Sequence, residues 1–294
     1  MTDSKPGIRG FETRELQWRA TPLRYAVGGP VAPEPSRAPG PPIVLVHGLG
    51  GTIANWRPLA EGLAGEHRVV VPDLPGHGGS APLPATPTVD VLADAVLAVL
   101  AAEEALPAVW VGHSLGGLLG VRAAARRPET VRALVLAAAA GISSSARAAE
   151  VTLSLLGIAQ PGRLLAPHRR AVARSRLGRR LAFGWWGAAD PFGLAPEQAE
   201  DFLCGPAEHT DTTWAGRALL ATDPRQELDR VACPCLCLWG ASDNWVPLED
   251  GFEYARRLRA PFRAIAGAGH LLIGERPDAC LAAIRELVSA LPDR

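Results

Sequence analysis

The chain has 294 residues, of which 30 are Lys or Arg and 30 are Asp or Glu, so its formal net charge is zero. This balance excludes a long-range field that would steer the protein to nucleic acid or to an anionic membrane, and we expect no nucleic-acid partner. No apolar run approaches the roughly 20 residues of a membrane span, and the first residues lack the apolar core of a secretory signal. We therefore expect a cytoplasmic protein, built as one large domain with an insertion or as two small domains.

The five cysteines are an odd number in a chain that is large enough to fold without disulfides. Three of them, Cys233, Cys235 and Cys237, alternate with other residues. On a strand this period of two places their thiols on one face of a buried run, and no second Cys or His cluster follows to complete a metal site. We expect reduced core thiols, no metal and no organic cofactor.

The first elements predict a β-hairpin after an N-terminal tail at residues 1–10. Glu12–Arg19 and Leu23–Val27 have strand-like composition and are separated by Thr21-Pro22, which is typical of a turn. Residues 28–42 are crowded with Pro and Gly and show no periodicity. This composition predicts a long surface loop between the hairpin and the next strand.

Apolar runs of strand length alternate with helical segments over most of the remaining chain. Strands are predicted at residues 43–46, 68–71, 109–111, 131–137, 235–239 and 262–265, and helices at residues 55–64, 89–104, 118–125, 248–259 and 277–291. Continuous apolar runs indicate strands buried on both faces, as in a parallel sheet. The regular alternation implies right-handed crossovers, so we predict an α/β fold of about eight strands, mostly parallel, with helices on both faces.

The alternation stops between residues 141 and 225, where prolines punctuate a segment of helical composition without a convincing strand. We interpret residues 141–225 as a helical cap inserted into a core formed by residues 11–140 and 226–294. The segment holds a large share of the aromatic residues: Phe183, Trp185, Trp186, Phe192 and Trp214. These side chains pack the cap onto the sheet or line a pocket for an apolar acyl or aromatic substrate, and the two interpretations are compatible.

Arginines are dense within this segment and are separated by apolar residues such as Leu177 and Leu181, a pattern that predicts an amphipathic helix. The arginines are Arg163, Arg169, Arg170, Arg174, Arg176, Arg179 and Arg180. A solvated helix face is the simplest interpretation. Contact with an anionic membrane surface and contact with a carboxylate of the substrate are the alternatives. The sequence does not indicate an oligomeric state.

The stretch from Gly112 to Gly116 has the pattern Gly-x-Ser-x-Gly and lies between a predicted strand and a predicted helix. At such a junction the serine is pushed out of the backbone, and the two glycines allow the strand and the helix to come close. The N-terminus of the helix directs free N–H groups toward an oxyanion formed at the serine. Ser114 is therefore a candidate nucleophile.

A serine hydroxyl is a weak nucleophile at neutral pH and needs a histidine base and a group that orients this base. Of the seven histidines, His270 follows the last predicted strand, at the sheet edge where the ligands of open α/β sheets collect. Asp243 lies in the loop after the strand predicted at 235–239. The chain order Ser114, Asp243, His270 is the order expected for a catalytic triad on such a sheet.

Five motifs in register resemble those of the α/β-hydrolase fold family over nearly the whole chain. They begin at His47, Asp73, Gly112, Gly240 and Gly267, and they read HGLGG, DLPGHGGS, GHSLGG, GASD with Val246-Pro247, and GAGH with Glu275 and Pro277. The resemblance implies a serine-nucleophile enzyme of the esterase or lipase-like branch with a helical cap. In such an enzyme Ser114 is the nucleophile, His270 is the base and then the acid, and Asp243 holds the imidazole.

The resemblance also implies roles for backbone groups and for one further carboxylate. The N–H groups of Leu49 and Leu115 would form the oxyanion hole, because the loop after the third strand supplies the second donor in this family. Asp73 would have a structural role and fix backbone N–H groups of its loop.

The residues around the serine narrow the chemistry that the resemblance implies. Epoxide hydrolases and haloalkane dehalogenases of this fold have an aspartate in place of Ser114, and prolyl aminopeptidases typically have Trp in place of Leu115. Hydrolases of carbon–carbon bonds in vinylogous diketones tend to have a small or polar residue in place of Leu49 and Asn in place of His113. We therefore expect hydrolysis of a carboxylic ester or thioester. Carbon–carbon bond hydrolysis is one alternative, and a small-molecule receptor that keeps the triad without turnover is another.

Overall fold

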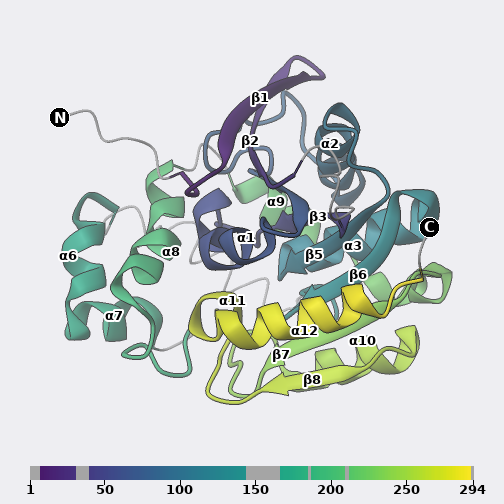
Figure 1. The fold of residues 1–294 in the computed structure, drawn as a ribbon. Coiled ribbons are helices and arrows are strands. Elements are labelled where there is room, and N and C mark those ends of the chain that lie inside the picture. Colours follow the sequence, from purple (N-terminus) through teal and green to yellow (C-terminus); the bar gives the residue numbers. More distant parts are fainter. Residues whose placement is uncertain (1–6, 31–39, 144–165, 185–186, 209–211, 293–294) are drawn as a thin grey trace.

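A computed structural model describes residues 7–30, 40–143, 166–184, 187–208 and 212–292 of the chain. One eight-stranded sheet with the strand order β1-β2-β4-β3-β5-β6-β7-β8 crosses the molecule (Figure 1). The strands are β1 Glu12–Trp18, β2 Thr21–Gly28, β3 Gly40–Val46, β4 His67–Pro72, β5 Ala108–His113, β6 Val131–Ala137, β7 Cys235–Gly240 and β8 Phe262–Ile265. Only the β1–β2 and β2–β4 pairs are antiparallel, so the predicted mostly parallel sheet of about eight strands is confirmed.

Helices cover the sheet and bury β5 and β7 completely. The helices are α1 Arg57–Leu63, α2 Val89–Ala102, α3 Leu115–Arg126, α6 Arg169–Arg174, α7 Arg176–Phe183, α8 Pro196–Glu208, α9 Thr213–Leu220, α10 Leu248–Leu258, α11 Leu272–Glu275 and α12 Pro277–Ser289. Short 3-10 helices are η1 Ile53–Trp56, η2 Pro128–Thr130, η3 Ala166–His168, η4 Pro224–Gln226 and η5 Leu228–Arg230. α1 packs against α12 and α2 against α3 (Figure 1), and every residue of β5 and β7 is buried.

The turn of the N-terminal hairpin lies two residues earlier than the sequence suggested. Thr21 and Pro22 belong to β2 and pair with Trp18 and Gln17 of β1. The turn is formed by Arg19 and Ala20, which both have positive φ (49° and 59°). Two residues with positive φ in succession form a turn that matches the twist of a hairpin. The usual sequence for this turn is Asn-Gly or Asp-Gly, so Arg19-Ala20 did not indicate it.

The N-terminal tail and the proline-rich loop are also shorter than predicted. Ile8 is 4% exposed and belongs to the main core, although it lies within residues 1–10. β2 extends to Gly28 and β3 begins at Gly40, so both ends of the loop predicted at 28–42 are strand. Residues 31–39 lie outside the described part of the chain.

The segment predicted as a cap contains two different groups of helices. Within its described part no strand occurs. α6, α7 and α8 surround a small apolar cluster of their own, at the side of the molecule away from α3 and α10 (Figure 1). α9 instead packs into the main core through Ala215 and Leu219. The boundary between cap and core predicted at residue 225 therefore does not separate the two apolar clusters.

All five cysteines are free, as predicted. Cys235 and Cys237 are buried in β7, and Cys233 lies just before this strand and is partly buried. Within the described residues no group of three His, Cys, Asp or Glu side chains is arranged to hold a metal ion. No helix in the described part of the chain is long and apolar enough to cross a membrane.

Candidate active site

Ser114 occupies a sharp turn between β5 and α3, as the sequence predicted. Its backbone has φ 52° and ψ −115°, a strained conformation for a residue with a side chain. The turn is possible only with glycines on both sides, because a Cβ at Gly112 would lie 2.2 Å from Gly116 O and a Cβ at Gly116 would lie 2.1 Å from Val46 O. The indole of Trp110 donates to the same Gly116 oxygen (2.9 Å) and fixes the turn from below the sheet edge.

Asp243 and His270 form a buried hydrogen-bonded pair on neighbouring loops. Asp243 follows β7 and His270 follows β8, so their loops emerge at the same edge of the sheet as Ser114. His270 Nδ1 lies 3.0 Å from Asp243 Oδ2. Asp243 Oδ1 accepts from the N–H groups of Trp245 and Val246, both at 2.8 Å. With Nδ1–H donated to the Asp243 carboxylate, Nε2 is the ring atom available to act as a base.

His113 connects the serine turn to the loop of His270. Its Nε2 donates to the carbonyl oxygen of His270 (2.8 Å), and the two rings lie 4.8 Å apart between centroids. Burial lowers the pKa of His113 to about 3, so the ring is neutral at physiological pH. Among the described residues neither Ser114 Oγ nor His270 Nε2 has a hydrogen-bond partner. The structure thus places the three predicted residues at one edge of the sheet. Of the two hydrogen bonds expected among them, it contains only the one between Asp243 and His270.

Two backbone N–H groups near Ser114 are free to receive negative charge. Leu115 is the first residue of α3, and its N–H therefore has no partner within the helix. Leu49 lies in the loop after β3. A Cβ at the preceding residue, Gly48, would lie 3.0 Å from Ser114 Cβ, so this loop passes close to the serine. In the described part of the chain no hydrogen bond involves the N–H of Leu49 or of Leu115.

His47 fixes the orientation of the peptide that carries the Leu49 N–H. Leu74 N donates to His47 Nε2 (3.0 Å), so the ring proton is on Nδ1, which donates to Gly48 O at 2.8 Å. Gly51 N donates to the same oxygen at 3.0 Å. In a trans peptide the N–H points away from the C=O, so holding Gly48 O sets the direction of Leu49 N–H. Burial lowers the pKa of His47 to about 4, which keeps the ring in this neutral form.

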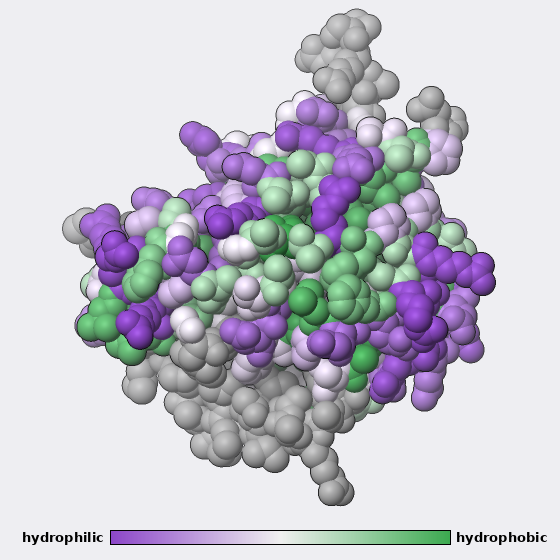
Figure 2. Space-filling view, turned by 90° about the horizontal axis from the view of Figure 1, so that it is seen from below, coloured by the Kyte–Doolittle hydropathy of each residue, from purple (hydrophilic) through white to green (hydrophobic). Residues whose placement is uncertain are grey.

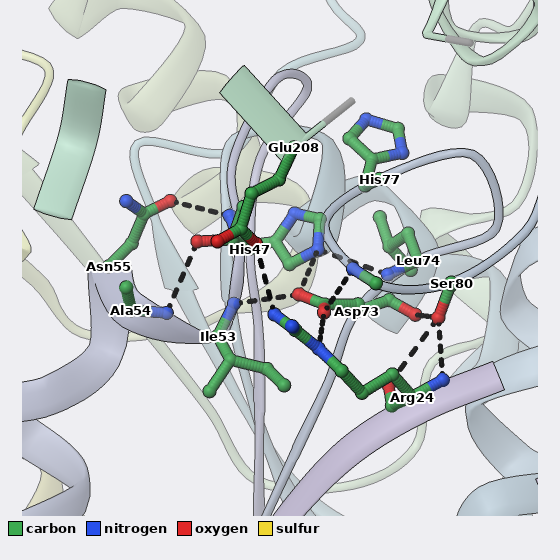
Figure 3. Close-up of polar contacts among 12 residues, drawn as sticks. Arg24, His47, Ile53, Ala54, Asn55, Asp73, Leu74, His77, Ser80 and Glu208 are labelled. Atoms are coloured by element: carbon green, nitrogen blue, oxygen red, sulfur yellow. Dashed lines mark hydrogen bonds and ion pairs between the residues drawn. The ribbon is translucent and has the colours of Figure 1, made fainter. Parts of the chain in front are cut away.

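Asp73 organises the loops behind the serine, in the structural role that the sequence predicted. Figure 3 shows its carboxylate between Arg24, Ile53 and the loop that follows β4. Asp73 accepts from Ile53 N (2.8 Å), from Gly79 N (2.9 Å) and from Arg24 Nε (2.6 Å). Burial raises the pKa of Asp73, and the Arg24 charge opposes this shift. No local pattern indicated a role for Arg24, because its acidic partner Asp73 lies 49 residues away along the chain.

Glu275 connects the helical insertion to the loop of His270. Its Oε2 accepts from Gly269 N (2.8 Å), and its Oε1 accepts from Ala189 N (2.7 Å) and Asp190 N (3.3 Å). Burial raises the pKa of Glu275, whereas the three N–H donors favour its ionised form. A motif of the family contains Glu275, but only the structure shows that the insertion supplies two of its donors.

Asp201 in α8 makes a second contact between the insertion and the core. Arg57 Nη2 donates to Asp201 Oδ1 (2.8 Å), and Asn55 Nδ2 donates to the backbone oxygen of Asp201 (3.1 Å). Asp201 Oδ2 is buried and has no hydrogen-bond partner within the described residues. Burial raises the pKa of Asp201 to about 7, although the Arg57 charge lowers it. Glu208 at the end of α8 makes a third contact, because it accepts from Arg24 Nη2 at 3.1 Å (Figure 3).

The three predicted substrate-binding aromatic residues that the structure describes lie in two different environments. Phe183 is 2% exposed and packs within the α6–α8 cluster, which also includes Leu271 next to His270. Phe192 and Trp214 are 40% and 38% exposed, and arginine guanidinium groups lie over both rings. α9, which carries Trp214, runs beside the loop of Leu49, because a Cβ at Gly216 would lie 3.5 Å from Leu49 Cδ2. Trp185 and Trp186 lie outside the described residues.

Known proteins resemble this chain in sequence and in fold. The dihydrolipoyllysine-residue acetyltransferase component of the acetoin cleaving system of Pseudomonas putida is 32% identical over 240 residues, 79% of this chain but only 59% of that relative. This chain therefore spans less than two thirds of that protein. The pimeloyl-[acyl-carrier protein] methyl ester esterase of Vibrio atlanticus is 32% identical over 222 residues, 74% of this chain and 83% of the relative.

A solved structure resembles this chain in fold, and a family model matches most of its sequence. The crystal structure of the enol-lactonase from Burkholderia xenovorans has a TM-score of 0.72 at 24% identity and covers 94% of this chain and 100% of its own. The model of the alpha/beta hydrolase family matches residues 43–283. With the predicted sheet and its serine turn in place, this match shows that the chain belongs to the α/β-hydrolase family.

Proposed function

We propose that the protein is a serine hydrolase that cleaves a carboxylic ester or thioester of an apolar acyl or aromatic substrate. The observation that carries this proposal is the buried Asp243–His270 pair at the same sheet edge as the strained turn of Ser114. A histidine held by a carboxylate is the base that a serine hydroxyl needs. The esterase among the relatives, 32% identical to this chain, supports ester hydrolysis as the reaction.

In the proposed reaction Ser114 Oγ attacks the acyl carbon while His270 Nε2 takes its proton. Asp243 holds Nδ1–H and stabilises the imidazolium that forms. The oxyanion accepts from the free N–H groups of Leu49 and Leu115, and donors of this kind contribute roughly 3–4 kcal/mol each to transition-state binding. His270 then gives its proton to the leaving group, which departs and leaves an acyl-enzyme on Ser114.

Deacylation repeats the same steps with water as the nucleophile. His270 removes a proton from water, and the hydroxide attacks the acyl-enzyme carbonyl. The proton returns to Ser114 Oγ as the carboxylic acid leaves. In this scheme Ser114 and His270 must approach each other, because no hydrogen bond joins them in the described structure. Hydrogen bonds between catalytic groups are often long in free enzymes and shorten when the substrate binds.

The proposal can be tested with p-nitrophenyl esters of increasing acyl length and a fluorophosphonate probe. We expect the native protein to hydrolyse these esters with a burst and to be labelled by the probe, and we expect Ser114→Ala to lose both properties. Ser289→Ala removes a hydroxyl at the end of α12 and should behave as the native protein. Labelling without turnover would instead point to a receptor that keeps the triad. Turnover of esters by the Ser114→Ala variant would contradict the proposal.

A further inference from the structure

The arginine-rich part of the insertion is two short helices and not the single amphipathic helix that the sequence suggested. Ser175 separates α6 from α7, has an extended backbone (φ −82°, ψ 128°) and accepts from Gly178 N at 3.1 Å through its hydroxyl. Serine in this position caps the N-terminus of α7. α7 therefore begins at Arg176 as a separate helix of eight residues, and its faces do not continue those of α6.

α7 departs from an ordinary amphipathic helix at Arg179, Leu177 and Leu181. Arg179 is buried, and its guanidinium donates to Ala173 O (2.6 Å) and Pro191 O (3.0 Å). Its role in a solvated face is therefore excluded. Leu177 and Leu181 lie one turn apart on the other side of the helix and are 65% and 67% exposed. The side of α7 that carries Leu177 and Leu181 therefore exposes apolar surface to solvent.

A third exposed apolar side chain, Phe192, lies close to α7, since the Arg176 guanidinium lies over its ring at 4.6 Å from the centroid. Five large apolar side chains are exposed among the described residues, and three of them are Leu177, Leu181 and Phe192. Single exposed leucines are ordinary, but two exposed leucines one turn apart on the helix that Phe192 adjoins through Arg176 indicate a contact surface. Figure 2 shows apolar atoms directly beside hydrophilic ones at the end of the molecule formed by α6 and α7.

The same surface carries arginines that form no ion pair with the described residues. Residues 166–184 contain six arginines and no acidic residue. Arg174, Arg176 and Arg180 are exposed, and within the described part of the chain none of the three has a carboxylate at ion-pair distance. We call Leu177, Leu181, Phe192 and these three arginines the α7 patch. The chain as a whole has no net charge, so this local excess determines what the patch attracts.

We propose that the α7 patch binds an anionic phospholipid surface. Leu177, Leu181 and Phe192 enter the boundary between headgroups and acyl chains, and the three arginines contact lipid phosphates. An acidic protein is a less suitable partner, because α7 is a two-turn helix at one extremity of the molecule (Figure 1). A stable protein interface needs about 800 Å² from each partner, and a short protruding helix provides little of it. Shallow insertion into a lipid surface needs a smaller area, because a few apolar side chains with cations beside them are sufficient.

Vesicle flotation of the purified full chain tests this proposal. We expect binding to vesicles of phosphatidylcholine mixed with phosphatidylglycerol, no binding to phosphatidylcholine alone, and release by salt. Leu177→Ser/Leu181→Ser and Arg174→Gln/Arg176→Gln/Arg180→Gln should each lower the partition coefficient by about tenfold or more. The matched controls are Phe252→Ser, which removes a 53% exposed apolar side chain, and Arg256→Gln/Arg263→Gln, which removes exposed charges near α10. Both controls should bind as the native protein does.

Three results would overturn the proposal. The first is equal binding to neutral and anionic vesicles, or binding to neither. The second is an equal loss in the α7 variants and in the two controls. The third is unchanged binding of the leucine variant together with complete competition by polyglutamate, which would assign the patch to an acidic protein. Circular dichroism and hydrolysis of a short water-soluble ester should be the same in all variants, because the altered side chains are exposed and lie outside the proposed catalytic machinery.

Discussion

Buried carboxylates are hydrogen-bonded more completely at the sheet edge around Ser114 than in the helices of the insertion. At the sheet edge, the carboxylates of Asp243 and Glu275 accept hydrogen bonds at both oxygens. In α8, Asp201 is equally buried, but within the described residues one of its carboxylate oxygens has no partner. A fully bonded network fixes one arrangement, whereas a partly bonded one holds its elements weakly. The site is therefore held more rigidly than the helices above it.

Acid should affect these two regions in opposite directions. His47 and His113 have pKa values lowered by burial to about 4 and about 3, so they stabilise the fold above pH 6.5 and lose this contribution as the pH falls toward those values. Asp201 has a pKa raised by burial to about 7, so its protonated form stabilises the fold at low pH and this contribution is lost as the pH rises through 7. The following variants test this contrast, in order of decreasing effect.

Asp243→Asn should have the largest effect and lower kcat by about 10⁴-fold. The amide nitrogen would face His270 Nδ1 and force the proton onto Nε2, the atom that must act as a base. Steady-state kinetics on a p-nitrophenyl ester, with Asp223→Asn as a control on a partly exposed acid, measure the change. A variant that keeps a tenth of the native kcat would rule out Asp243 as the orienting carboxylate.

His47→Gln should lower kcat by about tenfold to a hundredfold with little change in KM, because the Leu49 N–H loses its fixed direction. His47→Asn is the matched control, since an asparagine amide places an N–H close to the position of Nδ1 and can donate to Gly48 O. We expect this variant to recover most of the activity. Equal losses in the two variants would show that His47 acts only through packing.

His113→Gln should weaken the response of stability to acid. Between pH 7 and pH 5, protonation of the unfolded chain lowers the free energy of unfolding by about 2 kcal/mol for each histidine that the fold keeps neutral. The glutamine amide can still donate to His270 O but does not titrate. Urea unfolding at the two pH values should show that the variant loses about 2 kcal/mol less than the native protein. Parallel losses would contradict the lowered pKa of His113.

Glu275→Gln should lower kcat/KM by about tenfold, because the amide NH₂ would face the N–H of Gly269 or those of Ala189 and Asp190. The loss should be mainly in kcat, since the shift displaces the loop of His270. Glu286→Gln, on an exposed acid of α12, is the control. An unchanged kcat with a raised KM would assign Glu275 to substrate access and not to the position of His270.

Asp201→Asn should have the smallest effect and stabilise the protein by about 1 kcal/mol at pH 8. The change removes a buried charge while an amide oxygen can still accept from Arg57. At pH 5 the advantage should be smaller, because the folded protein then carries the Asp201 carboxyl in its protonated form. Urea unfolding at both pH values measures this difference. A destabilised variant at pH 8 would show that the Arg57 contact outweighs the cost of burying the charge.

The sequence predicted most of the sheet and the residues proposed for catalysis because both depend on local patterns. The strands predicted at Val131–Ala137 and Phe262–Ile265 have the same bounds as β6 and β8. The turn around Ser114 requires glycines at fixed positions, which the sequence displays directly. The start of α2 is a third example, since the helix predicted from residue 89 begins there and the Thr88 hydroxyl before it accepts from Val91 N.

Contacts between distant segments could not be predicted from one sequence. Arg24 and Asp73 meet because β2 lies beside β4, and no local pattern shows this neighbourhood. The same holds for Glu275 and the N–H groups of Ala189 and Asp190, since backbone donors leave no trace in composition. In α7, the arginines suggested a water-facing side, whereas Arg179 is buried by its contacts with carbonyl oxygens.

The pairing of β6 with β7 has a consequence for how activity returns during refolding. Leu134 lies opposite Cys235, so the whole insertion must be closed as a loop before β7 can join the sheet. Closing such a loop is entropically costly, and contacts of this range slow folding. Ser114 precedes the insertion, whereas Asp243 and His270 follow it. A chain with only β3, β5 and β6 assembled would thus contain a formed serine turn but no base, and hydrolysis would report on the last stage of folding.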